Sequence, residues 1–129
     1  MSNIYVIHGD ESQLIEDKKK SLMNQFSHLR EETFTVESGA MRINEALRED
    51  SIFGDGKLIV LSDVPVLKTT ERRGNKERLG NDTDWDNLYT ALSSYIGDNP
   101  VIMVYHSNLD KRVKNNKNFL AQVDEFHFH

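Results

Sequence analysis

The sequence contains no cysteine, no apolar run of membrane-spanning length and no basic stretch followed by an apolar one at its N-terminus. Without cysteine the chain has no disulfide, no thiolate zinc site and no cysteine nucleophile, so its fold must be held by packing alone. The missing apolar run argues against a membrane-spanning helix, and the missing N-terminal pattern argues against a secretory signal. We therefore expect a cytoplasmic protein without membrane contact.

Positive charge is also in short supply. The 129 residues include 16 Lys and Arg against 21 Asp and Glu, which gives a formal net charge of -5. A chain with this balance has no overall basic field with which to coat nucleic acid. Its apolar content of 37% is sufficient for one core, and its length does not allow two independent domains. We therefore expect a single domain over residues 1–129.

The apolar residues follow two patterns along the chain. Short β-branched and apolar runs predict strands, and apolar residues at helical spacing predict helices. The strands are expected at 3–8, 32–36, 57–61, 100–105 and 125–128, and the helices at about 12–29, 41–50, 85–96 and 111–121. Residues 62–84 are polar and charged, and we expect a mobile connection there. Strands and helices that alternate in this way predict an α/β fold with a three-layer, five-stranded parallel sheet.

The first expected strand leads to Gly9, where such folds place a phosphate-binding loop. That loop needs glycines around the phosphates, a lysine for their charge and a hydroxyl that ligates magnesium. Counting from Gly9, the positions of the second glycine, the lysine and the hydroxyl hold Leu14, Ile15 and Glu16. Asp10 and Glu11 would also repel a triphosphate. We expect a P-loop NTPase-like fold with a degenerate P-loop at Gly9, Asp10 and Glu11, and no nucleotide cofactor.

Three segments carry a resemblance to a known family. They read YVIHGDESQLIEDKKKSL, INEALREDSIFGDGKLIVL and NPVIMVYHSNLDKRVKNNKNF. In this order they resemble the N-terminal domain of the delta subunit of the DNA polymerase III clamp loader, and the resemblance covers essentially all 129 residues. The family's Gly-Asp-Glu after the first strand, its Leu-Phe-Gly before a Lys-rich strand and its Leu-Asp-Lys-Arg before a helix each have a counterpart here. The family's lid and collar domains do not.

The resemblance implies an AAA+ module that has lost nucleotide hydrolysis and grips the sliding clamp. In that family a Leu-Phe pair inserts into a hydrophobic pocket of the clamp, and this pair carries over to Ile52 and Phe53. The implied partners are the sliding clamp and the other clamp-loader subunits, with DNA reached through the assembly. General burial tendencies favour a different interpretation, in which Phe53 packs as a core residue under the edge of the sheet.

A basic group opens the last expected helix. It consists of Lys111, Arg112, Lys114 and Lys117. Such a group could contact phosphates or an acidic neighbouring subunit. The asparagines between these residues and the negative net charge favour a solvated helix face instead.

The histidines raise the question of a metal site. His8 and His106 follow expected strands, and His127 and His129 share one face of the last one. With the strand order 5-1-4 of the resembled fold, these strand ends are neighbours and could converge on zinc. Ordinary surface or half-buried histidines are the favoured interpretation, because a metal also needs a tuned second shell. We expect no metal and no catalytic set, and therefore no enzyme by itself.

A receiver domain of the response-regulator type is the alternative from another class. It also has five parallel strands in about this length, with acidic residues after the first strand, here Asp10 and Glu11, and a phosphoacceptor aspartate, here Asp63. The inserted Gly9 and the long connection at 62–84 argue against it. Magnesium with a beryllofluoride phosphoryl mimic separates the two hypotheses, because only a receiver should bind it through Asp63.

Overall fold

The structure is a computed structural model, and it describes residues 3–49, 56–70 and 82–128. The strands are β1 (Ile4–Gly9), β2 (Arg30–Phe34), β3 (Lys57–Ser62), β4 (Val101–Val104) and β5 (Asp124–Phe128). The helices are α1 (Ser12–Gln25), α2 (Ala40–Arg48), α3 (Asp82–Ser93) and α4 (Lys114–Leu120), with a short 3-10 helix η1 (Val36–Ser38) before α2. The five strands and four helices expected from the sequence are therefore confirmed.

The five strands form one sheet in the order β2-β3-β4-β1-β5, and every neighbouring pair is parallel. β1 lies between β4 and β5, with Ile7 beside Val104 and His8 beside His127. The expected order 5-1-4 is confirmed. The receiver alternative fails on the same point, since receivers belong to the doubly wound folds with the order 2-1-3-4-5.

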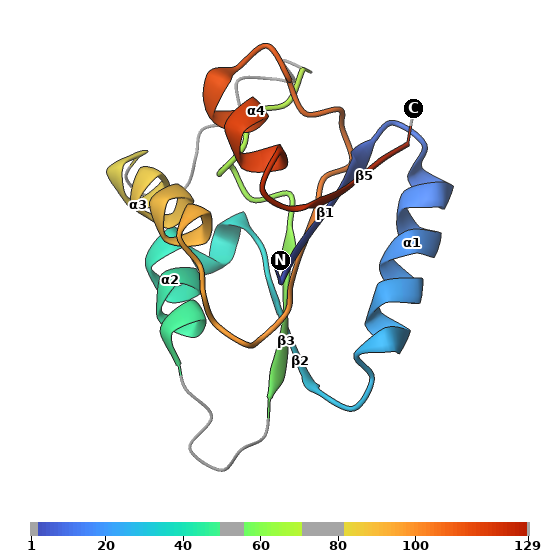
Figure 1. Ribbon diagram of the computed structural model, residues 1–129, viewed down its shortest axis with the longest axis vertical. Helices are drawn as coiled ribbons and strands as arrows, with labels where there is room; N and C mark the ends of the chain where they lie inside the picture. Colours follow the sequence, from blue (N-terminus) through green and yellow to red (C-terminus); the bar gives the residue numbers. More distant parts are fainter. Residues whose placement is uncertain (1–2, 50–55, 71–81, 129) are drawn as a thin grey trace.

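Helices cover both faces of the sheet, so the fold has three layers (Figure 1). α1 lies on one face, and α2, α3 and α4 lie on the other. Successive strand residues enter opposite cores: Val6 packs with the three-helix side and Ile7 packs with the α1 side. Both faces are thus withdrawn from water, which explains why β1, β3 and β4 are nearly continuous apolar runs rather than alternating ones.

The boundary of α1 differs from the expectation. The helix ends at Gln25 rather than near Leu29, although Phe26 and Leu29 still pack against the α1-side core. The chain leaves the helix through a tight turn, in which the Leu29 amide donates to the Phe26 carbonyl over 2.9 Å. The apolar spacing therefore continues through a turn, and spacing alone could not place the helix end.

The expected mobile connection at 62–84 is wrong for its first part. Val64, Val66 and Leu67 are buried in the core, and Thr69 forms an isolated bridge with Leu109. The buried Asn116 fixes the segment further, since its side chain donates to the Lys68 carbonyl over 2.7 Å and accepts from the Lys68 amide over 3.2 Å. These apolar residues lie within a segment that is polar on average, and an argument from average composition therefore did not predict their burial. Residues 71–81 lie outside the described residues.

The described ranges contain no helix that is both long and apolar enough to cross a membrane.

Candidate functional site

The loop after β1 is the first place to look for a ligand, because sites in such sheets lie beyond the carboxyl ends of the strands. Gly9 adopts a φ of 143°, and its amide donates to the Ser107 carbonyl over 3.2 Å. The amides of Asp10 and Glu11 both donate to the Phe128 carbonyl, over 3.0 and 3.3 Å. The backbone donors that a phosphate loop directs at its ligand are thus already bonded to β5 and to the segment after β4.

The start of α1 does not carry the P-loop side chains either. Ile15, at the position of the P-loop lysine, is fully buried in the α1-side core. Leu14, at the position of the second glycine, is 48% exposed. Glu16, at the position of the magnesium hydroxyl, is paired with His106 over 2.9 Å. The three positions of the P-loop pattern on this turn are therefore apolar or acidic, and the acidic one is held by a histidine.

His106 connects α1 to the ends of β3 and β4. Its ring Nδ1 lies 2.8 Å from Asp63 Oδ2 and its Nε2 lies 2.9 Å from Glu16 Oε2. Its backbone amide donates to Asp63 Oδ1 over 2.9 Å, and Asp63 itself has a positive φ of 52°. Both ring nitrogens face carboxylates, which favours the doubly protonated imidazolium. The aspartate offered as a phosphoacceptor is therefore engaged by a histidine that follows the neighbouring strand β4.

The charged groups of this bridge shift each other's pKa values. Partial burial acts to lower the pKa of His106, but its hydrogen bonds with Glu16 and Asp63 outweigh burial and raise the pKa above the usual value. The hydrogen bond from His106 lowers the pKa of Glu16 against a smaller opposing effect of burial. The two shifts favour the charged forms of both groups, and the bridge ties the start of α1 to the sheet.

A second cluster lies between β1 and β5. His8 is completely buried, stacks on His127 with ring centroids 4.1 Å apart, and lies 2.6 Å from Glu125 through its Nε2. His8, Glu125 and His127 are close enough together to offer three ligand atoms to a metal. Burial acts to raise the pKa of Glu125, but Lys111, 2.8 Å away, and His8 lower it overall.

The hydrogen bonds of His8 argue against a metal in that cluster. Its Nδ1 accepts from the Leu109 amide over 3.0 Å and so carries no proton, which assigns the proton to Nε2 as a donor to Glu125. A metal at Nε2 would displace this proton and require Nδ1 to be protonated against the Leu109 amide. Of the other histidines, His106 points to Asp63 and Glu16 instead, and His129 lies outside the described residues.

The basic residues before and along α4 are all exposed, and two of them have carboxylate partners. Lys111 pairs with Glu125, and Arg112 holds Asp110 in a two-point contact with both distances at 3.0 Å. The other two, Lys114 and Lys117, are exposed. Two of the four positive charges are therefore paired with neighbouring carboxylates, and a phosphate or subunit contact by this group stays a prediction.

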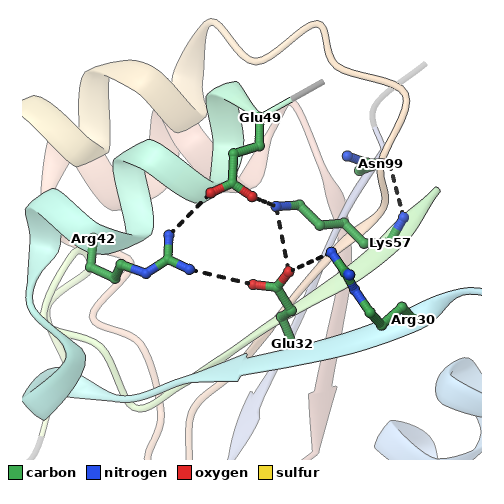
Figure 2. A network of polar contacts seen from close by, with 6 residues as sticks. All are labelled: Arg30, Glu32, Arg42, Glu49, Lys57 and Asn99. Atoms are coloured by element: carbon green, nitrogen blue, oxygen red, sulfur yellow. Dashed lines mark hydrogen bonds and ion pairs between the residues drawn. The ribbon is translucent and has the colours of Figure 1, made fainter. Parts of the chain in front are cut away.

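The start of β3, at the amino ends of the strands, holds a network that the sequence did not reveal. Ile52 and Phe53 lie outside the described residues, but the residues on either side of that stretch meet (Figure 2). Glu49 follows α2, Lys57 begins β3, and Lys57 Nζ lies 2.7 Å from Glu49 Oε2. Lys57 is only 5% exposed, which is unusual for a lysine.

Three further side chains complete what we call the Lys57 network: Arg30, Glu32, Arg42, Glu49 and Lys57 (Figure 2). Glu32 of β2 lies 3.7 Å from Lys57 and 3.2 Å from Arg30, and Arg42 of α2 lies 3.3 Å from Glu49. The hydrogen bond from Lys57 lowers the pKa of Glu49. One sequence signal could have indicated the network, namely a lysine at the first position of an otherwise apolar buried strand.

Comparisons with known proteins agree with the family inferred from the sequence. The family model described as DNA polymerase III, delta subunit matches residues 5–129. Among solved structures, the DNA clamp loader delta protein of Bacillus subtilis is similar, with a TM-score of 0.71 and 15% identity. The alignment covers 99% of this chain and 38% of that one, so this chain spans well under half of its relative's length. No curated protein matches. The chain belongs to the DNA polymerase III delta subunit family.

Proposed function

We propose that this chain is a noncatalytic part of a clamp loader, which binds the sliding clamp and helps to open it during DNA replication without hydrolysing ATP. Membership of the delta subunit family supports a role in the clamp loader. Residues 1–129 would form one AAA+-like N-terminal domain, acting in the cytoplasm beside other clamp-loader subunits. Those neighbours would supply the ATP-driven switching, and DNA would be reached through the assembly.

One observation carries the noncatalytic part of the proposal. The Phe128 carbonyl occupies the amides of Asp10 and Glu11, the donors that a nucleotide phosphate would need. The carboxylates of the same two residues add repulsion toward a triphosphate. Gly9, Asp10 and Glu11 are thus proposed to be a degenerate P-loop. The backbone turn is retained, and the Phe128 carbonyl at the end of β5 takes the place of the phosphate.

The clamp-binding part rests on Ile52 and Phe53, which the family resemblance assigns to the clamp pocket. Burial of one isoleucine and one phenylalanine contributes about 3–5 kcal/mol before the costs of association. Such an anchor would hold the clamp while the free energy of binding favours an open or strained ring. Binding and turnover would then be divided between subunits.

The experiment measures binding to the sliding clamp from the same source. We expect Phe53→Ala to weaken the interaction at least about tenfold, as for an interface hot spot, while the melting temperature stays nearly unchanged. Met41→Ala is the matched control, since Met41 is a 65% exposed apolar side chain at the start of α2, the helix that leads to the 50–55 stretch. It should bind like the unsubstituted protein.

Two outcomes would contradict the proposal. Loss of folding in Phe53→Ala would mean that this side chain is part of the core. Tight uptake of ATP in calorimetry would mean that the loop opens for a nucleotide.

A further inference from the structure

The exposed face of α4 consists of lysine and asparagine. Four side chains of the helix are exposed, and they are Lys114, Asn115, Lys117 and Asn118. Asparagine is among the weaker helix formers, and surface helices commonly gain stability from acidic and basic residues at helical spacing. α4 contains no acidic residue, although the chain has 21 of them. The stability of the helix therefore does not explain the composition of this face.

A lysine from the segment after β3 joins this face. The side chain of Asn116 is 2% exposed, accepts from the Lys68 amide over 3.2 Å and donates to the Lys68 carbonyl over 2.7 Å. The segment after β3 therefore runs beside α4 (Figure 1), and the exposed Lys68 lies next to the lysines on either side of Asn116. We call Lys68, Lys114 and Lys117 the α4 lysine patch.

The lysines of this patch have no carboxylate partner in the part of the chain that the structure describes. Other basic side chains do have one, namely Arg30, Arg42, Lys57, Lys111 and Arg112. The acidic neighbour of the patch is Asp110, whose amide donates to the Lys68 carbonyl and whose carboxylate is held by Arg112. The Asp110–Arg112 pair adds no net charge. Three unpaired positive charges thus gather on one surface of a chain whose net charge is -5.

The chemistry of this surface favours a nucleic-acid backbone over a protein as its partner. Protein interfaces have an apolar core, but the exposed large apolar side chains of the described residues, Leu14, Met41 and Ile96, all lie on other elements. Lysine and asparagine, in contrast, are side chains that contact the phosphates and sugars of nucleic acids. Phe119, the aromatic residue of α4, is 1% exposed and so is not available to stack on bases.

We propose that the α4 lysine patch binds the phosphate backbone of a nucleic acid, with Asn115 and Asn118 as hydrogen-bonding partners of the same backbone. The binding does not depend on base sequence, because phosphate contacts carry no sequence information. The inference goes beyond the proposed function, in which DNA is reached through the assembly, since it gives this chain a contact of its own. Three phosphate contacts are weak alone, and they add to the affinity of a larger assembly.

The test measures fluorescence anisotropy of a labelled DNA duplex of about 20 base pairs as the protein is added. With three phosphate contacts, the affinity should fall about fortyfold between about 50 mM and about 200 mM salt. The triple variant Lys68→Gln, Lys114→Gln and Lys117→Gln should lose this salt dependence and bind at least about thirtyfold more weakly at the lower salt concentration. Its melting temperature should stay nearly unchanged, because all three side chains are exposed.

A control with the same change in net charge comes from α1, which lies on the opposite face of the sheet. The triple variant Lys18→Gln, Lys19→Gln and Lys20→Gln should bind the duplex within about twofold of the unsubstituted protein, because salt screens charges that are distant from the bound DNA.

A gain of affinity tests the patch without the risk of lost folding. Asn118→Lys adds a positive charge to the exposed face of α4. It should strengthen binding and steepen the salt dependence by about one further phosphate contact.

Three outcomes would overturn the inference. Equal losses in the two triple variants would mean that only the net charge matters. Absence of binding by the unsubstituted protein at about 50 mM salt would mean that the patch is a solvated surface. Displacement of the duplex by polyglutamate of equal charge as readily as by unlabelled DNA would assign the patch to an acidic protein. Each of these outcomes leaves the proposed function standing, because the clamp-binding assay with Phe53→Ala contains no DNA.

Discussion

Replacement of Gly9 by alanine tests how tightly β5 closes the loop after β1. A Cβ at Gly9 would lie 1.8 Å from the Phe128 carbonyl oxygen, whereas such atoms normally stay about 3.3 Å or more apart. β5 would have to withdraw by about 1.5 Å, which breaks the bonds from the Asp10 and Glu11 amides to that oxygen. Each is worth about 1 kcal/mol, and an alanine at this positive φ adds about 1–3 kcal/mol of strain. We expect Gly9→Ala to lower the free energy of unfolding by about 3–5 kcal/mol.

Gly39→Ala separates strain from collision. Gly39 also has a positive φ, 86°, but a Cβ there would meet nothing within 4 Å. The free energy of unfolding of Gly39→Ala should therefore fall only by the cost of backbone strain, about 1–3 kcal/mol. Urea unfolding, followed by the fluorescence of the single buried tryptophan, Trp85, measures both variants. Equal losses in Gly9→Ala and Gly39→Ala would refute the reasoning, because the Phe128 carbonyl would then not be seated on the loop. The main support for the proposed degenerate P-loop would be lost as well.

Three further predictions concern the described residues. Because folding raises the pKa of His106, its bridge to Glu16 and Asp63 stabilises the fold fully below about pH 6.5 and loses this effect as the pH rises through the folded-state pKa. The stability difference between the protein and His106→Gln, about 1 kcal/mol for such partly exposed pairs, should therefore shrink toward alkaline pH in urea titrations; a difference that grows with pH would contradict the assignment. Leu88→Ala, at a fully buried position of α3, should lower the free energy of unfolding by about 2–5 kcal/mol in the same assay, and a loss below about 1 kcal/mol would mean that the site is not packed as described. Added zinc should not raise the melting temperature, because His8 holds its Nε2 proton for Glu125; a rise that depends on zinc concentration would place a metal there.

The sheet could be predicted because its signals are local. The apolar runs around Val6, Ile59 and Ile102 are long enough for strands covered on both faces, and each is followed by a helical pattern. The meeting of His8 with His127 also followed, once the strand order was assumed from the resembled fold. These features depend on the spacing of apolar residues and on the order of the elements, both of which can be read from a single sequence.

The side-chain contacts at the two ends of the strands, around Lys57 and around His106, could not be predicted. The partners of Lys57 come from β2 and α2, and those of His106 come from α1 and the end of β3. Every such pair depends on how far each element is rotated and shifted in the packed fold. Spacing along the chain does not encode those rotations, so the charged residues looked like an ordinary solvated surface.

The position of β1 has a consequence for how the protein is made. β1 pairs with β4 on one side and with β5 on the other, so it is complete in the sheet only when these two later strands have been made. Until residues 124–128 have emerged, β1 of a nascent chain has no partner on its β5 side, and that edge is open to mispairing. Folding of this domain should therefore complete only after β5 has been made, and a ribosome stalled before β5 should present a substrate for chaperones.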